Sequence, residues 1–64
     1  MTEAEFVLKI KETEEKLKLY MSWIELNLAK GETIEAAAAI DYIMAEATDF
    51  SIIHTDYVSE HFGS

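Results

Sequence analysis

The chain has 64 residues, with 5 basic and 13 acidic side chains, so its formal net charge at pH 7 is −8. A chain this short buries only about 60% of the surface that its unfolded form exposes, which limits it to one small core in a single domain, residues 1–64. The absence of cysteine excludes disulfide-stapled scaffolds and thiolate metal sites. Because 50% of the residues are hydrophobic, an intrinsically disordered acidic tail is excluded as well.

The sequence is typical of a soluble protein of a reducing compartment. The opening segment Met1–Glu5 is acidic, whereas a secretory signal opens with basic residues and then becomes apolar. The longest uninterrupted apolar run is Ala36–Ile40, far shorter than the ~20 residues that span a bilayer. We therefore expect a cytoplasmic protein without a membrane segment.

The first predicted helix covers about residues 3–29. Thr2 can cap its start, and Glu5 stands three residues later, where its side chain can bond back to the Thr2 amide. Lys30 and Gly31 predict its end, since glycine readily adopts the left-handed conformation that follows a helix. Apolar residues recur between them at the helical spacing of three and four: Phe6, Ile10, Leu17, Tyr20, Met21, Ile24 and Leu28, with Thr13 filling one position.

The second predicted helix starts at about residue 33, with Thr33 as its cap, and runs at least to residue 48. Four consecutive alanines, Ala36–Ala39, favour a helix strongly. The segment Thr48–Ser51 contains poor helix formers, so the chain either continues to about residue 62, straight or kinked, or breaks and starts a third helix there. The expected buried stripe is Ala36, Ile40, Ile43, Ala47, Phe50 and Tyr57, with His54 on it.

These elements predict an all-α fold, an antiparallel helical hairpin. A connection of about three residues between two long helices makes them antiparallel neighbours. A lone hairpin of this size rarely holds its own core, so we expect it to assemble into a helical bundle as a homo-oligomer. The final pair Gly63-Ser64 is either native or an added tail.

The first helix has a second apolar side formed by Leu19, Trp23 and Leu26. At 100° per residue these three lie roughly opposite the core stripe. Either the second or a third helix covers them, or they contact another chain. A tryptophan-anchored apolar patch favours the second interpretation, an interface.

Acidic residues dominate the second half of the chain. Residues 31–64 carry 7 acids and no base, whereas residues 1–30 carry 6 acids and 5 lysines. This acidic face is either solvated or engages a basic groove on a protein partner, where rows of carboxylates imitate phosphate charge. The residues predicted to form it on a continuous helix are Glu35, Glu46, Asp49, Asp56 and Glu60.

Catalytic and cofactor chemistry find little support. The sequence contains no metalloprotease motif, no glycine-rich phosphate loop and no cysteine nucleophile. His54 and His61 stand seven apart, which is poor spacing for two ligands of one metal. We therefore expect no enzyme, no cofactor and no metal site.

In outline the chain is similar to the plasmid RNA-binding regulator Rop: its length, its acidic helical hairpin and the mid-chain turn. This resemblance implies pairing of two hairpins into a four-helix bundle. It does not extend to the aromatic and basic RNA face, because Glu14 and Glu15 lie in the middle of the first helix. The opening Thr2–Phe6 also looks like the first helix of colicin immunity proteins, but nothing downstream does.

Together these features predict a non-enzymatic interaction protein that binds a larger protein and inhibits or redirects it. Small acidic helical proteins without cysteine are frequent among bacteriophage factors, and such a protein would act in the host cytoplasm on a nucleic-acid or defence enzyme. The alternative is a Rop-like homodimeric RNA-binding regulator that works through Lys9, Lys11, Lys16 and Lys18. With no arginine and a strong negative charge, direct nucleic-acid binding is not expected.

Overall fold

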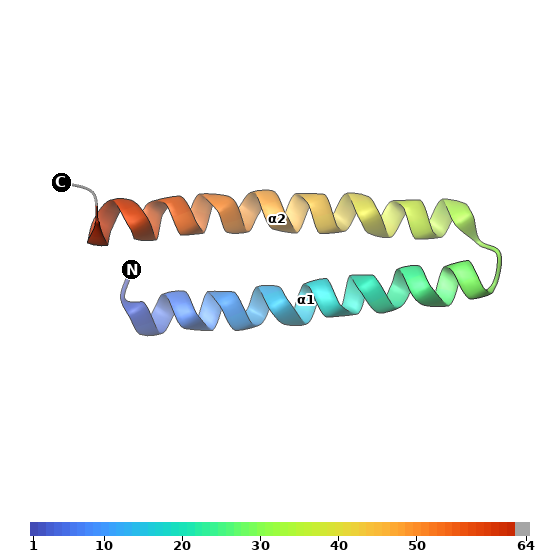
Figure 1. Cartoon of the computed structure of the whole chain (residues 1–64), viewed down its shortest axis with the longest axis horizontal. Coiled ribbons are helices and arrows are strands. Elements are labelled where there is room, and N and C mark those ends of the chain that lie inside the picture. The colour runs from blue at the N-terminus through green and yellow to red at the C-terminus, as the bar shows by residue number, and fades with distance from the viewer. Residues whose placement is uncertain (63–64) are drawn as a thin grey trace.

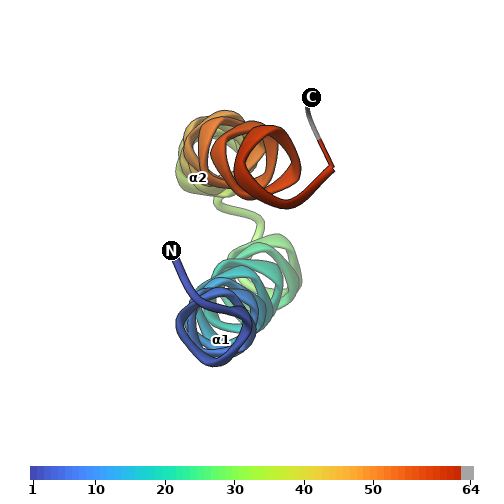
Figure 2. The ribbon, with the colours of Figure 1, turned by 90° about the vertical axis from the view of Figure 1, so that its left-hand side faces the viewer.

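The structure, a computed structural model, describes residues 1–62. It consists of two helices, α1 (Glu3–Ala29) and α2 (Thr33–His61), which lie side by side in opposite directions (Figures 1 and 2). This confirms the predicted all-α antiparallel hairpin. Gly63 and Ser64, whose origin the sequence leaves open, lie outside the described residues. Within the described chain, neither helix is long and apolar enough to cross a membrane.

The start of α1 is fixed by the capping box that the sequence predicted. The Thr2 hydroxyl accepts a hydrogen bond from the Glu5 amide at 3.1 Å, and the Glu5 carboxylate accepts one from the Thr2 amide at 3.4 Å. Two backbone donors that the first helical turn leaves without partners are satisfied in this way. α1 therefore begins at Glu3, as predicted.

The end of α1 is a Schellman turn around Gly31. The Gly31 amide donates to the Leu28 carbonyl at 3.0 Å, and the Glu32 amide donates to the Asn27 carbonyl at 2.8 Å. Gly31 has a φ of 75°, which residues with a Cβ adopt only at a cost. The sequence therefore predicted this turn correctly.

α2 begins at Thr33, as predicted, but its capping residue differs from the prediction. The cap is Glu32, not Thr33, and the Ala36 amide donates to the Glu32 carbonyl at 3.2 Å. The reason is the Schellman turn, which draws the Glu32 amide back onto α1 and leaves Thr33 free to enter the helix directly. No side chain caps this helix.

α2 continues unbroken through Thr48–Ser51, the segment where the sequence allows a break or a kink (Figure 1). The Thr48 hydroxyl donates to the Met44 carbonyl at 3.0 Å, one turn earlier. This bond satisfies the polar group inside the helix, so the segment does not need to unwind. No third helix forms in the described chain.

The two helices pack along one seam whose residues repeat in steps of three and four, the pattern of an antiparallel coiled coil. α1 contributes Phe6, Ile10, Thr13, Leu17, Tyr20, Ile24 and Asn27, and α2 contributes Ala36, Ala39, Ile43, Glu46, Phe50, Ile53 and Tyr57. The prediction was right for most of α1, but Met21 and Leu28 are exposed. For α2 it was partly wrong, because Ile40 and Ala47 are exposed while Ala39, Glu46 and Ile53 occupy the seam.

Burial along this seam is shallow. Among the described residues only Ala36, Ala39 and Asn27 are buried, and no large hydrophobic side chain is fully buried. The Cα trace measures 50 × 17 × 10 Å, with a radius of gyration of 15.0 Å. A compact domain of this length would have a radius of gyration of about 11 Å. The hairpin is therefore a flat rod that leaves both of its broad sides open.

Aromatic rings hold the open end of the hairpin together, away from the turn. The Phe6 ring lies parallel to the Tyr57 ring, with centroids 4.2 Å apart, and also contacts Phe50 and His54 at 6.0 and 6.2 Å. Ring pairs at these separations stabilise beyond the area that they bury. His54 therefore lies at the edge of the seam, next to the aromatic cluster.

We predict that replacing Gly31 with alanine destabilises the hairpin by about 1 kcal/mol, because the left-handed backbone is strained for a residue with a Cβ. The space around the position is open, so no steric clash contributes. Thermal unfolding followed by circular dichroism at one fixed concentration measures the change. Gly31→Asn is the control, since asparagine tolerates this conformation and is expected to lose less. Equal melting of the alanine variant and the wild type would contradict the prediction.

Candidate functional site

The seam divides the surface of the hairpin into two opposite flanks. The seam residues of each helix alternate between two heptad positions, a and d. In an antiparallel coiled coil, the residues just before the a positions of both helices lie on one side, and the residues just after the d positions lie on the opposite side. We name them the Trp23 flank and the Met21 flank. Trp23 and Tyr42 define the first, since their rings stack across the helices with centroids 5.7 Å apart. The Tyr42 ring also stacks on Tyr20 at 5.7 Å, which ties the flank to the seam.

The predicted apolar anchors lie together on the Trp23 flank. Leu19, Trp23 and Leu26 follow one another at steps of four and three along α1, and they are 66%, 37% and 62% exposed. Tyr42 of α2 covers part of the Trp23 ring, and α2 leaves most of the two leucine side chains exposed. Their exposure agrees with the expectation of a second apolar side, and their role as partner contacts stays a prediction.

A polar rim borders this apolar patch toward the open end of the hairpin. An open hollow of about 300 Å³ lies beside Leu19 and is lined also by Glu12, Glu15 and Lys16. The charged groups supply hydrogen-bond donors and acceptors next to an apolar centre. An apolar centre with a polar rim is the usual composition of a protein-binding surface.

Three of the five predicted acidic residues lie on the same flank as Trp23. Glu35, Asp49 and Asp56 are spaced in multiples of seven, and Tyr42 occupies the position between the first two. Residues seven apart fall on the same side of a coiled-coil helix, so all three carboxylates lie on the side that Tyr42 marks. Three members of the predicted acidic set therefore share a surface with the predicted apolar anchors.

The prediction was wrong for Glu46, which does not lie on the acidic outer face. Its side chain is only 17% exposed, sits in the seam and pairs with the Lys16 ammonium at 3.6 Å. The physical reason is the phase of α2, which turns Glu46 inward and Ala47 outward. A carboxylate in this position is neutralised inside the hairpin, so it contributes less to attraction of a partner.

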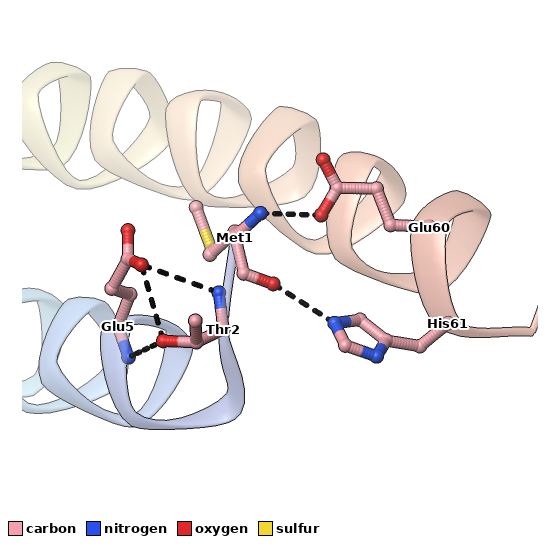
Figure 3. Close-up of polar contacts among 5 residues, drawn as sticks. All are labelled: Met1, Thr2, Glu5, Glu60 and His61. Atoms are coloured by element: carbon pink, nitrogen blue, oxygen red, sulfur yellow. Dashed lines mark hydrogen bonds and ion pairs between the residues drawn. The ribbon is translucent and has the colours of Figure 1, made fainter.

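Glu60 is also engaged within the chain, at the open end (Figure 3). Its carboxylate accepts a hydrogen bond from the Met1 ammonium, and the Met1 carbonyl lies 2.9 Å from His61 Nε2. The hydrogen bond to Glu60 raises the pKa of the Met1 amine, and the same bond lowers the pKa of Glu60. These contacts fasten the start of α1 to the end of α2.

The histidines and lysines do not assemble into a second site. The described residues contain no group of three or more histidine, cysteine, aspartate or glutamate side chains placed to hold a metal ion. His61 packs on Tyr57, with ring centroids 4.3 Å apart. Lys9 pairs with Glu12 at 3.6 Å and Lys16 with Glu46, while Lys11 and Lys18 lie toward the Met21 flank. The four lysines proposed for RNA contact are therefore split between two sides.

Two features of the surface and the seam were not predicted from the sequence. Asn27 is buried near the turn, where its side-chain amide donates to the Trp23 carbonyl at 2.8 Å. Composition does not distinguish a buried asparagine from an exposed one. The position of Asn27 in the three-four repeat of α1, however, indicates that it is buried. The Met21 flank was also missed, because its α2 residues were assigned to the core.

We predict that Glu60→Gln lowers hairpin stability only within a limited pH window. The lowered pKa of Glu60 means that its contribution is present above its ordinary value of 4.5 and is lost as the pH falls through the lowered pKa. The raised pKa of the Met1 amine means that its contribution is present below 8.0 and is lost as the pH rises through the raised value.

Thermal unfolding of the 64-residue chain against pH measures this effect. Wild type and Glu60→Gln should differ most between the two ordinary values and converge at either extreme. Glu25→Gln, which removes a carboxylate in the middle of α1, is the control and should show no such window. A difference independent of pH would contradict the assignment.

No protein-family model matches the chain, and no match was found among curated proteins or solved structures. The likeness to Rop accordingly stays one of outline. What the molecule does has to be inferred from its own surfaces.

Proposed function

We propose that this chain is a non-enzymatic interaction protein that binds a larger protein with a basic surface through the Trp23 flank and inhibits or redirects it. The observation that carries the proposal is the exposure of Leu19, Trp23 and Leu26 on a hairpin whose described residues, 1–62, form no further layer over them. Exposed apolar patches centred on a tryptophan are characteristic of protein–protein contacts.

The apolar anchors supply enough free energy to matter for a chain of this size. Burying three large side chains at ~25 cal/mol per Å² contributes several kcal/mol. This is comparable to the whole stability of a small domain, which is about 5–15 kcal/mol. Contact with a partner over this patch is therefore a substantial driving force for association.

Charge indicates the kind of partner. Residues 31–64 carry 7 acids and no base, and Glu35, Asp49 and Asp56 lie on the Trp23 flank. Such a surface attracts a basic groove over long range and accelerates encounter. A groove that normally holds nucleic-acid phosphates fits this chemistry, as expected for a phage-type factor acting on a nucleic-acid or defence enzyme in the host cytoplasm.

Capture of partners from a bacterial lysate at two salt concentrations tests the proposal. The wild type should retain a basic protein at low salt and release it as the salt concentration rises, because screening weakens attraction between exposed charges. Trp23→Ala and Leu26→Ala should each weaken binding at least tenfold, since a central apolar anchor contributes about 2 kcal/mol and tenfold corresponds to about 1.4 kcal/mol.

Leu28→Ala is the matched control for Leu26→Ala. The two leucines are two residues apart on opposite flanks, with exposed fractions of 55% and 62%. Leu28→Ala should reduce capture much less than Leu26→Ala does. Equal loss in both variants, or unchanged capture by Leu26→Ala with its helical spectrum intact, would show that the surface is assigned wrongly. Salt-dependent RNA binding without a captured protein would favour the Rop-like alternative.

A further inference from the structure

The hairpin exposes more surface than a folded chain of its mass should. Its accessible area is 4917 Å². A monomeric protein of 7.3 kDa exposes about 4,200 Å², so the excess is about 700 Å². A standard interface buries about 800 Å² on each partner. The excess therefore matches one covered face, and the flat rod has two faces that could supply it.

The Met21 flank is the face with fewer charges across its centre. α2 contributes an apolar stripe that again follows the three-four spacing, and its Ile40 and Met44 are 48% and 63% exposed. The α2 stripe contains no carboxylate and no lysine, and the α1 edge carries charges of both signs among its apolar side chains. The α2 stripe is Ala37, Ile40, Met44, Ala47, Ser51, His54 and Val58, and the apolar residues of the α1 edge are Val7, Met21 and Leu28.

Charge decides which flank can meet a second copy of the same chain. Each copy carries a net charge of −8, so two copies repel each other, and like charges brought face to face in the contact would add to this repulsion. A contact between two Trp23 flanks would bring Asp49 and Asp56 of one copy toward the acidic residues of the other. The nearby Lys9 and Lys16 already pair with Glu12 and Glu46 within their own chain. The α2 stripe of the Met21 flank brings no carboxylate into the contact.

We propose that a second copy of this chain covers the Met21 flank, with the α2 helices of the two copies antiparallel and crossing at Ala47. A two-fold axis requires a self-complementary surface. An axis through Ala47 places Ile40 opposite His54, since each stands seven residues from Ala47, and Met44 near Ser51, three residues before and four after it. The small Ala47 side chain at the crossing point lets the helices approach. The assembly is a four-helix bundle that leaves both Trp23 flanks outward. This proposal does not depend on the proposed function.

Single-cysteine cross-linking tests this arrangement, because the chain has no cysteine of its own. A residue on a two-fold axis lies opposite itself, so Ala47→Cys should form an inter-chain disulfide under mild oxidation, within the 4.4–6.8 Å Cα separation that a disulfide spans. Ala45→Cys is the matched control, an exposed alanine on the opposite flank, and should stay largely uncross-linked. Preferential cross-linking of Ala45→Cys would overturn the assignment.

Sedimentation supplies an independent measurement. The wild type should sediment at twice 7.3 kDa, and Ile40→Glu should shift the association at least tenfold toward monomer, whereas Leu26→Ala should keep the dimer mass. A monomeric wild type, or a dimer broken by Leu26→Ala and kept by Ile40→Glu, would overturn the proposal. If the Ile40→Glu chain unfolds when the dimer dissociates, the comparison of Ala47→Cys with Ala45→Cys still tests the proposal. Failure here leaves the partner-capture result with Leu26→Ala unaffected, so the two proposals fail separately.

Discussion

Two helices can bury only one stripe each against the other, and this limit determines everything else about the hairpin. The residues that meet closely along the seam are small, since only Ala36 and Ala39 among its apolar members are buried. Larger seam side chains such as Phe6 and Tyr57 stack on each other and stay partly exposed. A core this shallow leaves apolar side chains on both flanks, and each flank is a surface on which a further chain can pack.

The predictability of each helix depended on how sharply its sequence separates apolar from charged positions. In α1 an apolar spacing of three and four runs without interruption from Phe6 to Leu28, so most of its buried side was predictable, and the Thr2–Glu5 capping box and Gly31 made its ends predictable. In α2 the alanines at 36–39 suit the seam and either flank equally, and Ile40 with Ala47 forms as good a stripe as the true one. The packing of Phe50 and Ile53 against α1 and the ion pair between Glu46 and Lys16 determine which side of α2 faces α1. Both depend on the register between the helices, which the sequence of α2 alone does not give.

The candidate site shows the same division between local and long-range information. That Leu19, Trp23 and Leu26 share a side follows from helical geometry within α1 alone. That Tyr42 joins them, and that Glu35, Asp49 and Asp56 lie on the same flank, depends on the alignment of α2 against α1. The Trp23–Tyr42 stack fixes that alignment. Glu60 is a further case, because its partner is an amine 59 residues away in the sequence.

The negative charge of the chain acts differently on the two flanks. On the Trp23 flank, carboxylates beside an apolar patch repel an identical surface and attract a basic one, so the same groups oppose self-association and favour a foreign partner. On the Met21 flank, the α2 stripe, which contains no carboxylate and no lysine, gives no long-range preference, and fit between apolar side chains decides what binds. The two proposals are compatible because of this separation: a dimer formed through the Met21 flank would present two copies of the Trp23 flank and so increase the avidity for a partner with two accessible sites.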